Sequence, residues 1–591
     1  MATGLPASVP ELLRARATDT GLAQRVKRFG LWQRITWSEY VADVNAMAAE
    51  YVALGLEPGD RVAILSENRP EWTVADMATQ TAGGATVGVY TTSSPEQLRY
   101  YLQHSDAVGL VLEDAEQLEK WLAVRDECPA VRFVLLVEDR EASDPAVTPY
   151  STALESGRRR YLSDPRPVDE RLAAISPEDV ALFIYTSGTT GDPKAAMLSH
   201  ANIIWATEAL RRALDCGPGD EFLSFLPVSH IVERLISIAN PIRWGYAVSF
   251  TENLDTVLND LREIRPTIFF AVPRIWEKLY SLVELHMKDA QFLKRVAYQR
   301  AMAAVRHARS PAGSSAGALT LALANLAVLA PLRNRLGLDR VRLAISGAAP
   351  ISAEILAYFR SIGVDVREGF GLTESTGLIC LCPKQVRLGT VGTPFWGVDV
   401  DIAEDGEILS RSPGNFLGYH KDPQSTAETL KDGWLHTGDI GELDELGHLK
   451  ITDRKKDILI TAGGKNIAPQ KIENQLKSSV YINDAVVLGD KRRYLVALLV
   501  LDEDNVRHWA ADRQLSYSTY TDLTQNPAVV SLIDAEVERV NCALARVETV
   551  KRFAILPKRL YHEDGEVTAT LKVKRSSIAE RYGDLVESLY A

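Results

Sequence analysis

The feature that most constrains the fold is a regular alternation of strand-like apolar runs and helical segments over most of residues 1–450. The strand-like runs are Arg61–Leu65, Ala107–Leu112, Val131–Val137, Ala181–Thr186, Thr267–Val272 and Arg342–Ser346. The helical patterns between them are Trp37–Leu54, Pro70–Thr81, Pro95–Gln103 and Ser352–Ser361. Strands that alternate with helices in this way are typical of parallel sheets with crossover helices. The sequence therefore predicts an α/β fold.

The pattern changes near residue 453, where a turn at Asp444–Gly447 is followed by the charged segment Thr452–Asp457. A short charge run of this kind is most often a solvated turn. Around and after it, the pattern predicts strands at Leu449–Ile451, Ile458–Thr461, Asp484–Leu488 and Tyr494–Val500, and helices at Ala535–Val547 and Ser576–Leu589. We therefore predict one large domain over residues 1–453 and a smaller α+β domain over residues 454–591.

Charge and cysteine content limit the partners and the compartment. The chain has 66 basic and 78 acidic residues, a net charge of -12, whereas nucleic-acid binding favours a basic face. Nucleic acid is therefore not expected as a partner. The five cysteines are an odd number and form no CxxC pair, so we predict neither a disulfide framework nor a zinc site. We expect a cytoplasmic protein in which Cys380 and Cys382 are buried as small apolar residues.

The segment Met1–Thr20 lacks the basic start and apolar block of a secretory signal. The most apolar run, Ala316–Ala330, carries Asn325 and ends before Pro331. A helix that spans a bilayer needs about 20 apolar residues. We therefore predict a buried or surface-lying helix here. A peripheral contact with the inner membrane surface is kept as an alternative.

The strongest local motif is Tyr185–Lys194, which reads YTSGTTGDPK and follows an apolar strand. Its hydroxyls and glycine backbone can surround an anion, and Lys194 adds a positive charge. The alternative is an ordinary Gly/Ser/Thr-rich surface loop. The motif is not a Walker A loop, because Asp192 and Pro193 separate Gly191 from the lysine. No GxSxG elbow follows a strand-like run, and no HExxH motif occurs, so a P-loop ATPase and a serine hydrolase are poorly supported.

Further motifs follow this loop in a fixed order along nearly the whole chain. They are Leu226–His230 (LPVSH), Ser346–Pro350 (SGAAP), Gly369–Glu374 (GFGLTE), Gly433–Asp439 (GWLHTGD), Arg454, Gly463–Ile467 (GGKNI) and Thr570–Lys572 (TLK). The ordered set resembles the adenylate-forming superfamily, which includes acyl-CoA synthetases, luciferases and peptide-synthetase adenylation domains. The resemblance implies a large N-terminal domain of layered mixed sheets with flanking helices, and a small mobile α+β C-terminal domain.

The resemblance also implies the binding residues for ATP and Mg²⁺. The β- and γ-phosphates would be held by Thr186, Ser187, Gly188, Thr189, Thr190 and Lys194. The adenine and the adenylate would be held by Gly347, Ala348, Ala349, Phe370 and Gly371, the α-phosphate by Thr373, the ribose by Asp439 and Arg454, and Mg²⁺ by Glu374 and Thr186. Phe370 stands where the superfamily usually has tyrosine, and Ala195 stands where it usually has glycine.

The resemblance identifies Lys572 as the catalytic lysine. Its ammonium group would bridge the substrate carboxylate and the α-phosphate. Lys574 is an alternative two positions later. Relatives rotate their small domain between two half-reactions, which places a hinge at Lys456 and brings Gly463 and Gly464 to the pantetheine arm of coenzyme A. His230 would gate the acyl and thiol tunnels, although a buried hydrogen-bonded histidine is the alternative interpretation.

The segments Gly88–Ser94, Ala271–Lys278 and Leu279–Leu338 resemble the long-chain fatty acyl branch. This implies that a medium- to long-chain fatty acid is activated with ATP and Mg²⁺ and passed to coenzyme A. Aryl or specialised-metabolite acids, and a carrier-protein phosphopantetheine as acceptor, stay open as alternatives. A binding module without activity is disfavoured, because Glu374, Asp439 and Lys572 are all present. The sequence does not determine the oligomeric state, and a homodimer is one alternative.

Overall fold

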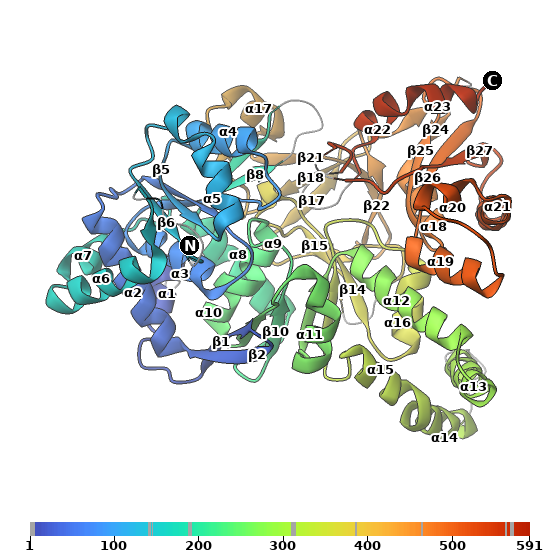
Figure 1. Ribbon diagram of the computed structural model, residues 1–591, viewed down its shortest axis with the longest axis horizontal. Helices are drawn as coiled ribbons and strands as arrows, with labels where there is room; N and C mark the ends of the chain where they lie inside the picture. Colours follow the sequence, from blue (N-terminus) through green and yellow to red (C-terminus); the bar gives the residue numbers. More distant parts are fainter. Residues whose placement is uncertain are drawn as a thin grey trace.

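The computed structural model describes residues 6–139, 144, 146–186, 192–308, 315–383, 387–462, 465–561, 564–567 and 573–591. Figure 1 shows a large body, blue to yellow, and a smaller orange-to-red body formed by the C-terminal residues. The predicted α/β fold with a smaller α+β C-terminal unit is confirmed.

The first large sheet has eight strands within the described ranges, in the order β19-β9-β8-β4-β3-β5-β6-β7. Their bounds are β3 (Arg61–Leu65), β4 (Ala85–Val89), β5 (Ala107–Leu112), β6 (Phe133–Leu136), β7 (Thr148–Pro149), β8 (Val180–Thr186), β9 (Lys194–Ser199) and β19 (Gly418–Tyr419). The strands from β8 to β7 are parallel, whereas β9 and β19 are antiparallel. The parallel strands are apolar on both faces, as expected for strands that helices cover on each side.

The second large sheet has nine strands in the part of the chain that the structure describes, in the order β16-β15-β14-β13-β12-β10-β11-β1-β2. Their bounds are β1 (Leu22–Arg28), β2 (Leu31–Thr36), β10 (Glu221–Ser224), β11 (Ala247–Phe250), β12 (Ile268–Ala271), β13 (Leu343–Ser346), β14 (Val366–Phe370), β15 (Cys380–Leu381) and β16 (Thr393–Pro394). The central strands are parallel, and the edges at β2, β15 and β16 are antiparallel. One hydrophobic core joins the two sheets through Ile64, Ile184, Phe222 and Phe270, and Cys380 and Cys382 are buried as predicted.

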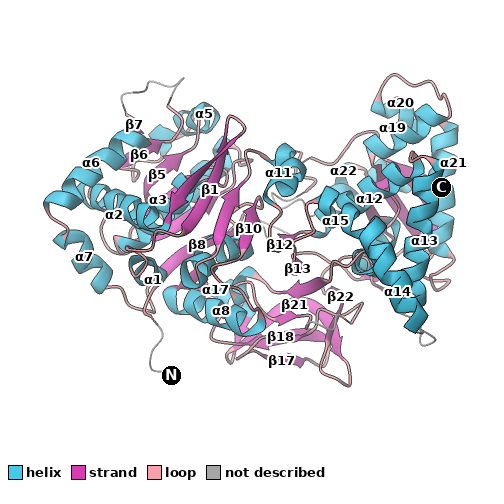
Figure 2. Cartoon of the chain, turned by 90° about the horizontal axis from the view of Figure 1, so that it is seen from below, coloured by secondary structure: helices cyan, strands magenta, loops and turns pink. Residues whose placement is uncertain are grey.

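Helices connect these strands, and Figure 2 shows strands of the large body in magenta between helices in cyan. The helices are α1 (Val9–Arg14), α2 (Trp37–Ala53), α3 (Pro70–Thr81), α4 (Pro95–Ser105), α5 (Ala115–Leu122), α6 (Tyr150–Ser163), α7 (Arg166–Ala173), α8 (His200–Ala213), α9 (Ile231–Arg234), α10 (Asn240–Trp244), α11 (Val257–Ile264), α12 (Pro273–Lys288), α13 (Phe292–Ala308), α14 (Ser315–Ala324), α15 (Ala330–Leu336) and α16 (Ala353–Ser361). The local sequence determines where several of these helices begin. Thr36 and Glu39 form a capping box before α2, and Pro70 fits the first turn of α3, where a backbone N–H has no helical partner.

A third, antiparallel sheet leads from the large body to the small one. Its strands are β17 (Asp399–Ile402), β18 (Glu407–Arg411), β20 (Leu430–Lys431), β21 (Trp434–Leu443) and β22 (Leu449–Arg454), and helix α17 (Pro423–Thr429) precedes β20. The prediction of a turn over Thr452–Asp457 is wrong in its first half. β22 continues through Arg454, because Asp453 and Arg454 pair with Ile440 and Asp439 of β21, and the turn occupies residues 455–457.

The C-terminal body has its own cores around a three-stranded sheet. Its elements are β23 (Leu459–Ile460), β24 (Asn466–Ile467), α18 (Pro469–Leu476), β25 (Ile482–Leu488), β26 (Leu495–Leu501), α19 (Glu503–Asp512), α20 (Tyr520–Gln525), α21 (Pro527–Asn541), β27 (Val550–Ile555), α22 (Arg575–Arg581) and α23 (Gly583–Ser588). Two predictions are corrected here. The helix expected at Ala535–Val547 is α21, which begins and ends earlier. The last helix is interrupted at Tyr582.

The apolar run Ala316–Ala330 is helical and lies at the surface. It forms most of α14, then the π-turn η4 (Asn325–Leu329), and then enters α15. Leu323 and Leu326 are exposed, whereas Leu329 is buried. No helix among the described residues is long and apolar enough to cross a bilayer.

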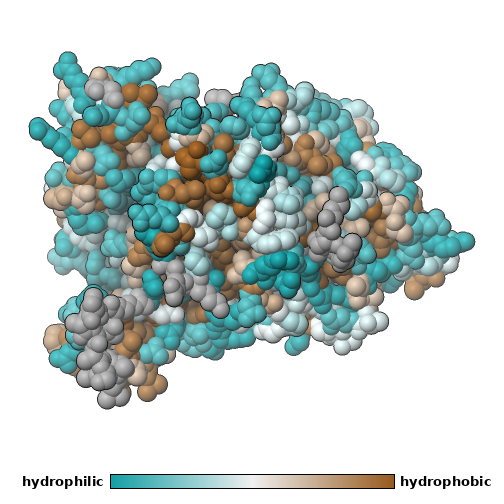
Figure 3. Space-filling view, turned by 180° about the vertical axis from the view of Figure 1, so that it is seen from behind, coloured by the Kyte–Doolittle hydropathy of each residue, from teal (hydrophilic) through white to brown (hydrophobic). Residues whose placement is uncertain are grey.

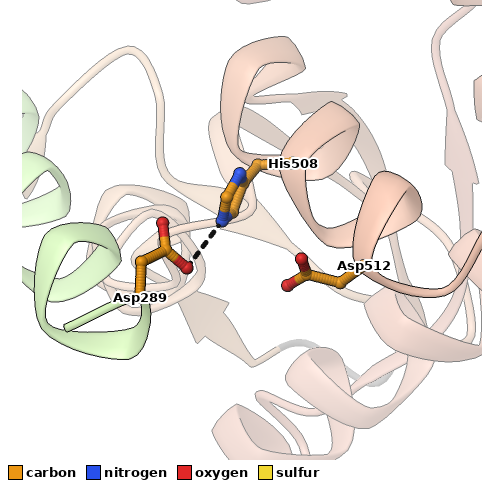
Figure 4. A group of neighbouring side chains, drawn as sticks. All are labelled: Asp289, His508 and Asp512. Carbon is orange, nitrogen blue, oxygen red and sulfur yellow. Dashed lines mark hydrogen bonds and ion pairs between the residues drawn. The ribbon is translucent and has the colours of Figure 1, made fainter. Parts of the chain in front are cut away.

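The two bodies meet along α12. Lys288 Nζ donates to the hydroxyl of Tyr481 at 3.0 Å, and His508 Nε2 lies 3.0 Å from Asp289 Oδ1. Figure 4 shows this second contact, with Asp512 one turn further along α19. Both contacts join the end of α12 to the C-terminal body.

Candidate active site

A cavity of about 3030 Å³ is lined by residues of both bodies. Strands β15 and β22 lie at the junction of the bodies in Figure 1. Residues of both strands line the cavity. All the described residues that the sequence predicts as site residues line this cavity: Thr186, Lys194, His230, Gly347, Ala348, Ala349, Phe370, Gly371, Thr373, Glu374, Asp439, Arg454 and Lys456. Ser187, Gly188, Thr189, Thr190, Gly463, Gly464 and Lys572 lie outside the described residues.

The ends of the candidate phosphate loop are fixed by the β8–β9 hairpin. Thr186 ends β8 and is paired with Lys194, the first residue of β9. The hydroxyl of Tyr100 donates to the carbonyl of Pro193 at 3.0 Å, which fixes the chain just before the lysine. The hairpin therefore places the Thr186 hydroxyl and the Lys194 ammonium at the two ends of one short loop, where a polyanion can contact both.

In this structure Lys194 binds protein groups. Its Nζ donates to the hydroxyl of Ser425, lies 3.6 Å from Asp422 Oδ2, and stands 5.4 Å from the centre of the Tyr419 ring. The sequence did not predict these partners, which lie in β19, in α17 and at the N-cap of α17. Residues 419–425 thus orient the ammonium group of Lys194.

The turn after β13 contains backbone strain. Ala348 has a φ of +68°, a region that residues with a side chain rarely adopt. The turn follows Ser346, whose buried hydroxyl has no partner among the described protein groups. Strain and an unpaired hydroxyl are both found where a backbone is shaped for a ligand rather than for stability.

The segment after β14 requires glycine for steric reasons. A Cβ atom on Gly371 would lie 2.1 Å from the carbonyl oxygen of Gly377. This close approach lets the chain turn sharply after Phe370, so that Thr373 and Glu374 enter the short helix η5 (Thr373–Ser375). The turn thereby brings the Phe370 ring, a hydroxyl and a carboxylate to the same wall of the cavity.

Glu374 is oriented by a tyrosine from the other large sheet. The hydroxyl of Tyr419 donates to Glu374 Oε1 at 2.6 Å. Burial raises the pKa of Tyr419, so the phenol stays protonated and acts as a donor. The carboxylate of Glu374 and the hydroxyl of Thr186 are hard oxygen donors on one cavity, a set that fits Mg²⁺.

Asp439 lies in β21 opposite Arg454 of β22, and only 5% of its surface is exposed. Arg454 Nε lies 3.4 Å from Asp439 Oδ1. Glu407 fixes the preceding turn by accepting from the backbone N–H of Gly438 at 2.9 Å and from Lys455 Nζ at 3.0 Å. A buried carboxylate that is held by its strand and lines a cavity can accept two hydrogen bonds from neighbouring hydroxyls.

Lys456 is an exposed residue in the turn that connects the two bodies. Asp453, three residues earlier, is buried and accepts from the backbone N–H of Gln470 at 3.2 Å. Burial raises the pKa of Asp453 to about 6. Arg575 donates to both carboxylate oxygens of Glu473, at 2.7 and 2.8 Å, and this pair adjoins the same turn. Charged contacts thus surround the turn that connects the two bodies.

His230 caps the N-terminus of helix α9, where its Nδ1 accepts from the backbone N–H of Val232 at 3.3 Å. Behind it lies a buried polar network. Ser224 and Ser237 donate to Glu233 Oε1 at 2.6 and 2.7 Å. Asn68 donates to the hydroxyl of Ser224 and accepts from the N–H of Val228, so the network also fixes the turn that carries the histidine.

The buried carboxyl of Glu233 should make the protein less stable at alkaline pH. Burial raises its pKa from 4.5 to about 8, so the folded protein keeps a proton that the unfolded chain releases within this window. The free energy of unfolding therefore falls as the pH rises from 4.5 to 8, by an amount on the order of 5 kcal/mol from this group. The substitution Glu233→Gln keeps the accepting oxygen and removes the charge.

We expect Glu233→Gln to match the wild type in thermal unfolding at pH 6 and to unfold several degrees higher at pH 9. The exposed carboxylate of Glu170 gives a matched control, and Glu170→Gln should follow the wild type at both pH values. A difference between Glu233→Gln and the wild type that stays constant with pH would contradict this assignment.

The chain belongs to the AMP-binding enzyme family. The family profile matches residues 13–420, and the profile of the AMP-binding enzyme C-terminal domain matches residues 456–591. The predicted resemblance to adenylate-forming enzymes is thereby confirmed.

Two curated relatives cover most of the chain. A long-chain-fatty-acid–CoA ligase, FadD15 of Mycobacterium bovis, is 36% identical over 568 residues, which span 95% of this chain and 93% of that protein. The ligase ACSBG1 of Rattus norvegicus is 32% identical over 598 residues, 95% of this chain and 82% of that protein. Among solved structures, a didomain of carboxylic acid reductase from Segniliparus rugosus in complex with AMP has a TM-score of 0.75 at 22% identity, covering 100% of this chain and 83% of that one. This likeness supports the fold.

Proposed function

We propose that this protein is an ATP-dependent ligase that converts a medium- to long-chain fatty acid to its acyl-adenylate and then to its coenzyme A thioester. The observation that carries the proposal is one cavity that joins an oxygen-donor site at Thr186 and Glu374, a buried carboxylate at Asp439 and an apolar wall beside His230. The names of the curated relatives support the same substrates.

The first half-reaction joins the acid to AMP. A carboxylate oxygen attacks the α-phosphorus of ATP, the bond to the bridging oxygen breaks, and pyrophosphate leaves. The chain positions the groups and neutralises charge, as is usual for phosphoryl chemistry. The loop from Thr186 to Lys194 binds the β- and γ-phosphates, and Thr373 binds the α-phosphate. Mg²⁺, held by Glu374 and Thr186, would neutralise charge on the phosphates.

The nucleoside is held by the strand ends around β13, β14 and β21. The strained backbone of Gly347–Ala349 and the flat face of Phe370 enclose the adenine. Asp439 accepts hydrogen bonds from both ribose hydroxyls, and Arg454, beside it, adds a contact to the ribose or a phosphate. Phenylalanine at position 370 keeps the stacking face and lacks the hydroxyl of the usual tyrosine.

The apolar wall supports an alkyl chain as the acyl group. It is formed by Ile184, Leu235, Ile236, Phe270, Ile345, Leu378 and Leu381. Burial of an alkyl chain is worth about 0.8 kcal/mol per methylene, so such a wall favours longer chains. An aryl or specialised-metabolite acid is the alternative substrate, and a carrier-protein phosphopantetheine is the alternative acceptor.

The second half-reaction needs a different arrangement of the bodies. The thiol of coenzyme A attacks the acyl carbon, AMP leaves, and no protein nucleophile is required. We propose domains over residues 1–453 and 454–591 with a hinge at Lys456, about which the small domain rotates to bring Gly463 and Gly464 to the pantetheine. The rotation breaks the contacts of Lys288 with Tyr481 and of Asp289 with His508. A cytoplasmic location stays a prediction.

Acid-dependent exchange of radiolabelled pyrophosphate into ATP, measured across a panel of acids, tests the first step. We expect the highest kcat/KM with long-chain fatty acids, and product formation that requires free coenzyme A. Exchange with none of the acids would overturn the enzyme proposal. Higher kcat/KM with aryl acids, or transfer only to a carrier protein, would replace the substrate or the acceptor.

Removal of the Tyr419 hydroxyl should weaken Mg²⁺ binding, because Glu374 loses the donor that orients its carboxylate. We expect Tyr419→Phe to raise the Mg²⁺ concentration for half-maximal exchange by roughly tenfold, the value of one hydrogen bond to a charged group. Tyr494→Phe removes a hydroxyl that donates to Leu589 in the C-terminal body and serves as the control. An unchanged Mg²⁺ requirement in Tyr419→Phe would argue against Glu374 as a metal ligand.

A further inference from the structure

One stretch of the chain departs sharply from its overall charge. Residues 290–338 contain seven lysines and arginines and no aspartate or glutamate, in a protein whose net charge is -12. This stretch forms α13, α14, η4 and α15. On α13 the basic side chains of Lys294, Arg295, Arg300 and Arg306 are all exposed. The helices therefore form a positive region on an acidic molecule.

The same helices expose large apolar side chains. Phe292 and Leu293 at the start of α13 are 68% and 79% exposed, and Leu323 and Leu326 of α14 and η4 are 59% and 74% exposed. Figure 1 shows α13 and α14 projecting from one corner of the large body. In the view of Figure 3 some brown apolar atoms lie beside teal polar atoms at the lower left corner. We call these four apolar residues and the four basic residues of α13 the hairpin surface.

The opposite side of the hairpin is well packed, so the exposure is not a sign of loose structure. Tyr298, Ala301 and Val305 of α13 are buried in the second hydrophobic core together with Leu329. Arg333 donates to the carbonyl of Ile362 at 2.6 Å and to Asn325 at 3.1 Å, which ties η4 and α15 to the body. The apolar residues of the hairpin surface thus point outward from a fixed scaffold.

We propose that the hairpin surface binds the headgroup region of an anionic lipid bilayer. Outward apolar side chains beside lysines and arginines are the pattern by which helices lie in a membrane interface, with the apolar groups below the headgroups and the cations among the phosphates. The proposal goes beyond the proposed function and does not depend on it.

Charge distinguishes a membrane from the other occupants of such a surface. In a two-fold dimer the hairpin surface of one copy would contact the hairpin surface of the other. The cations of the two copies would then face each other, because residues 290–338 contain no acidic residue that could pair with them. Nucleic acid would contact the arginines but would leave the four large apolar residues against a charged backbone. An anionic bilayer can bind both kinds of residue, the basic ones at its phosphates and the apolar ones below its headgroups.

Co-sedimentation of the whole protein with vesicles tests the proposal. We expect binding to mixed phosphatidylcholine and phosphatidylglycerol vesicles, much less binding to pure phosphatidylcholine, and release as salt rises. The double variants Leu323→Ser/Leu326→Ser and Lys294→Glu/Arg300→Glu should each lower the partition coefficient roughly tenfold or more. Thermal unfolding checks that the variants remain folded.

Matched controls use similar residues elsewhere. Leu162→Ser/Leu446→Ser removes two exposed leucines, and Arg159→Glu/Lys551→Glu reverses two exposed charges, so both should bind like the wild type. Failure of the wild type to bind anionic vesicles overturns the proposal, as does equal loss in variants and controls. A wild-type dimer in gel filtration that becomes a monomer in Leu323→Ser/Leu326→Ser would instead assign the surface to a second copy of the chain.

Discussion

Replacement of Lys572 by alanine should lower acid-dependent pyrophosphate exchange by roughly 100- to 1000-fold. The reason is electrostatic. Negative charge gathers between the substrate carboxylate and the α-phosphate in the transition state, and the ammonium group of a lysine stabilises it there. Lys572 lies outside the described residues, and the following residues, Val573 and Lys574, line the cavity.

The control for this prediction is Lys574→Ala. The backbone N–H of Lys574 donates to the carbonyl of Glu566 at 2.9 Å, a bond that the substitution keeps. We expect Lys574→Ala to retain most of the exchange activity. Lys572→Ala should still transfer an acyl group from added acyl-adenylate to coenzyme A, because that step proceeds after the lysine has acted. Exchange that survives in Lys572→Ala and disappears in Lys574→Ala would transfer the role to Lys574.

Elements with strong local signals could be predicted closely. The apolar run Arg61–Leu65 is strand β3, and the pattern Pro70–Thr81 is helix α3, with the same bounds. In the first case the run is apolar on both faces and sits between turn residues. In the second, proline at the first position defines the start. Local chemistry and tertiary packing agree at these places.

Helix α21 shows why other bounds could not be predicted. It begins at Pro527, because Asn526 caps the first turn and Val529 and Ile533 are buried in the core of the small body. It ends at Asn541, whose side chain exchanges two hydrogen bonds of 2.9 Å with the backbone of Val550 on β27. That contact depends on the fold of the small body and has no signal in the residues before it.

The candidate site, too, could be predicted only in part. Motifs in a fixed order were sufficient to name residues that the structure places on one cavity, such as Thr186, Glu374 and Asp439. Their orienting partners were missed. Tyr419 lies 45 residues from Glu374 in sequence and reaches it only because β19 pairs with β9. A tyrosine in a short strand has no feature that distinguishes it from a core residue until this pairing is known.

Substitution of Asp439 by asparagine should lower kcat/KM for ATP roughly 100-fold, mainly through a higher KM. The carboxylate is 5% exposed and can accept from two ribose hydroxyls, and each hydrogen bond to a charged group contributes about 1.5–3 kcal/mol. Asparagine has one accepting oxygen, and its amide group would donate toward groups that also donate. Asp401→Asn changes an exposed carboxylate in the same sheet and should have no effect.

A comparison of ATP with 2′-deoxy-ATP tests the ribose contact directly. The wild type should lose roughly tenfold in kcat/KM with the deoxy nucleotide, because one hydrogen bond to Asp439 cannot form. The Asp439→Asn enzyme should lose much less, since most of that interaction is already absent, and the difference measures the coupling between the carboxylate and the hydroxyl. If Asp439→Asn discriminates between the nucleotides as strongly as the wild type, the 2′-hydroxyl is bound elsewhere. Arg454, 3.4 Å from Asp439, would then be the residue to substitute next.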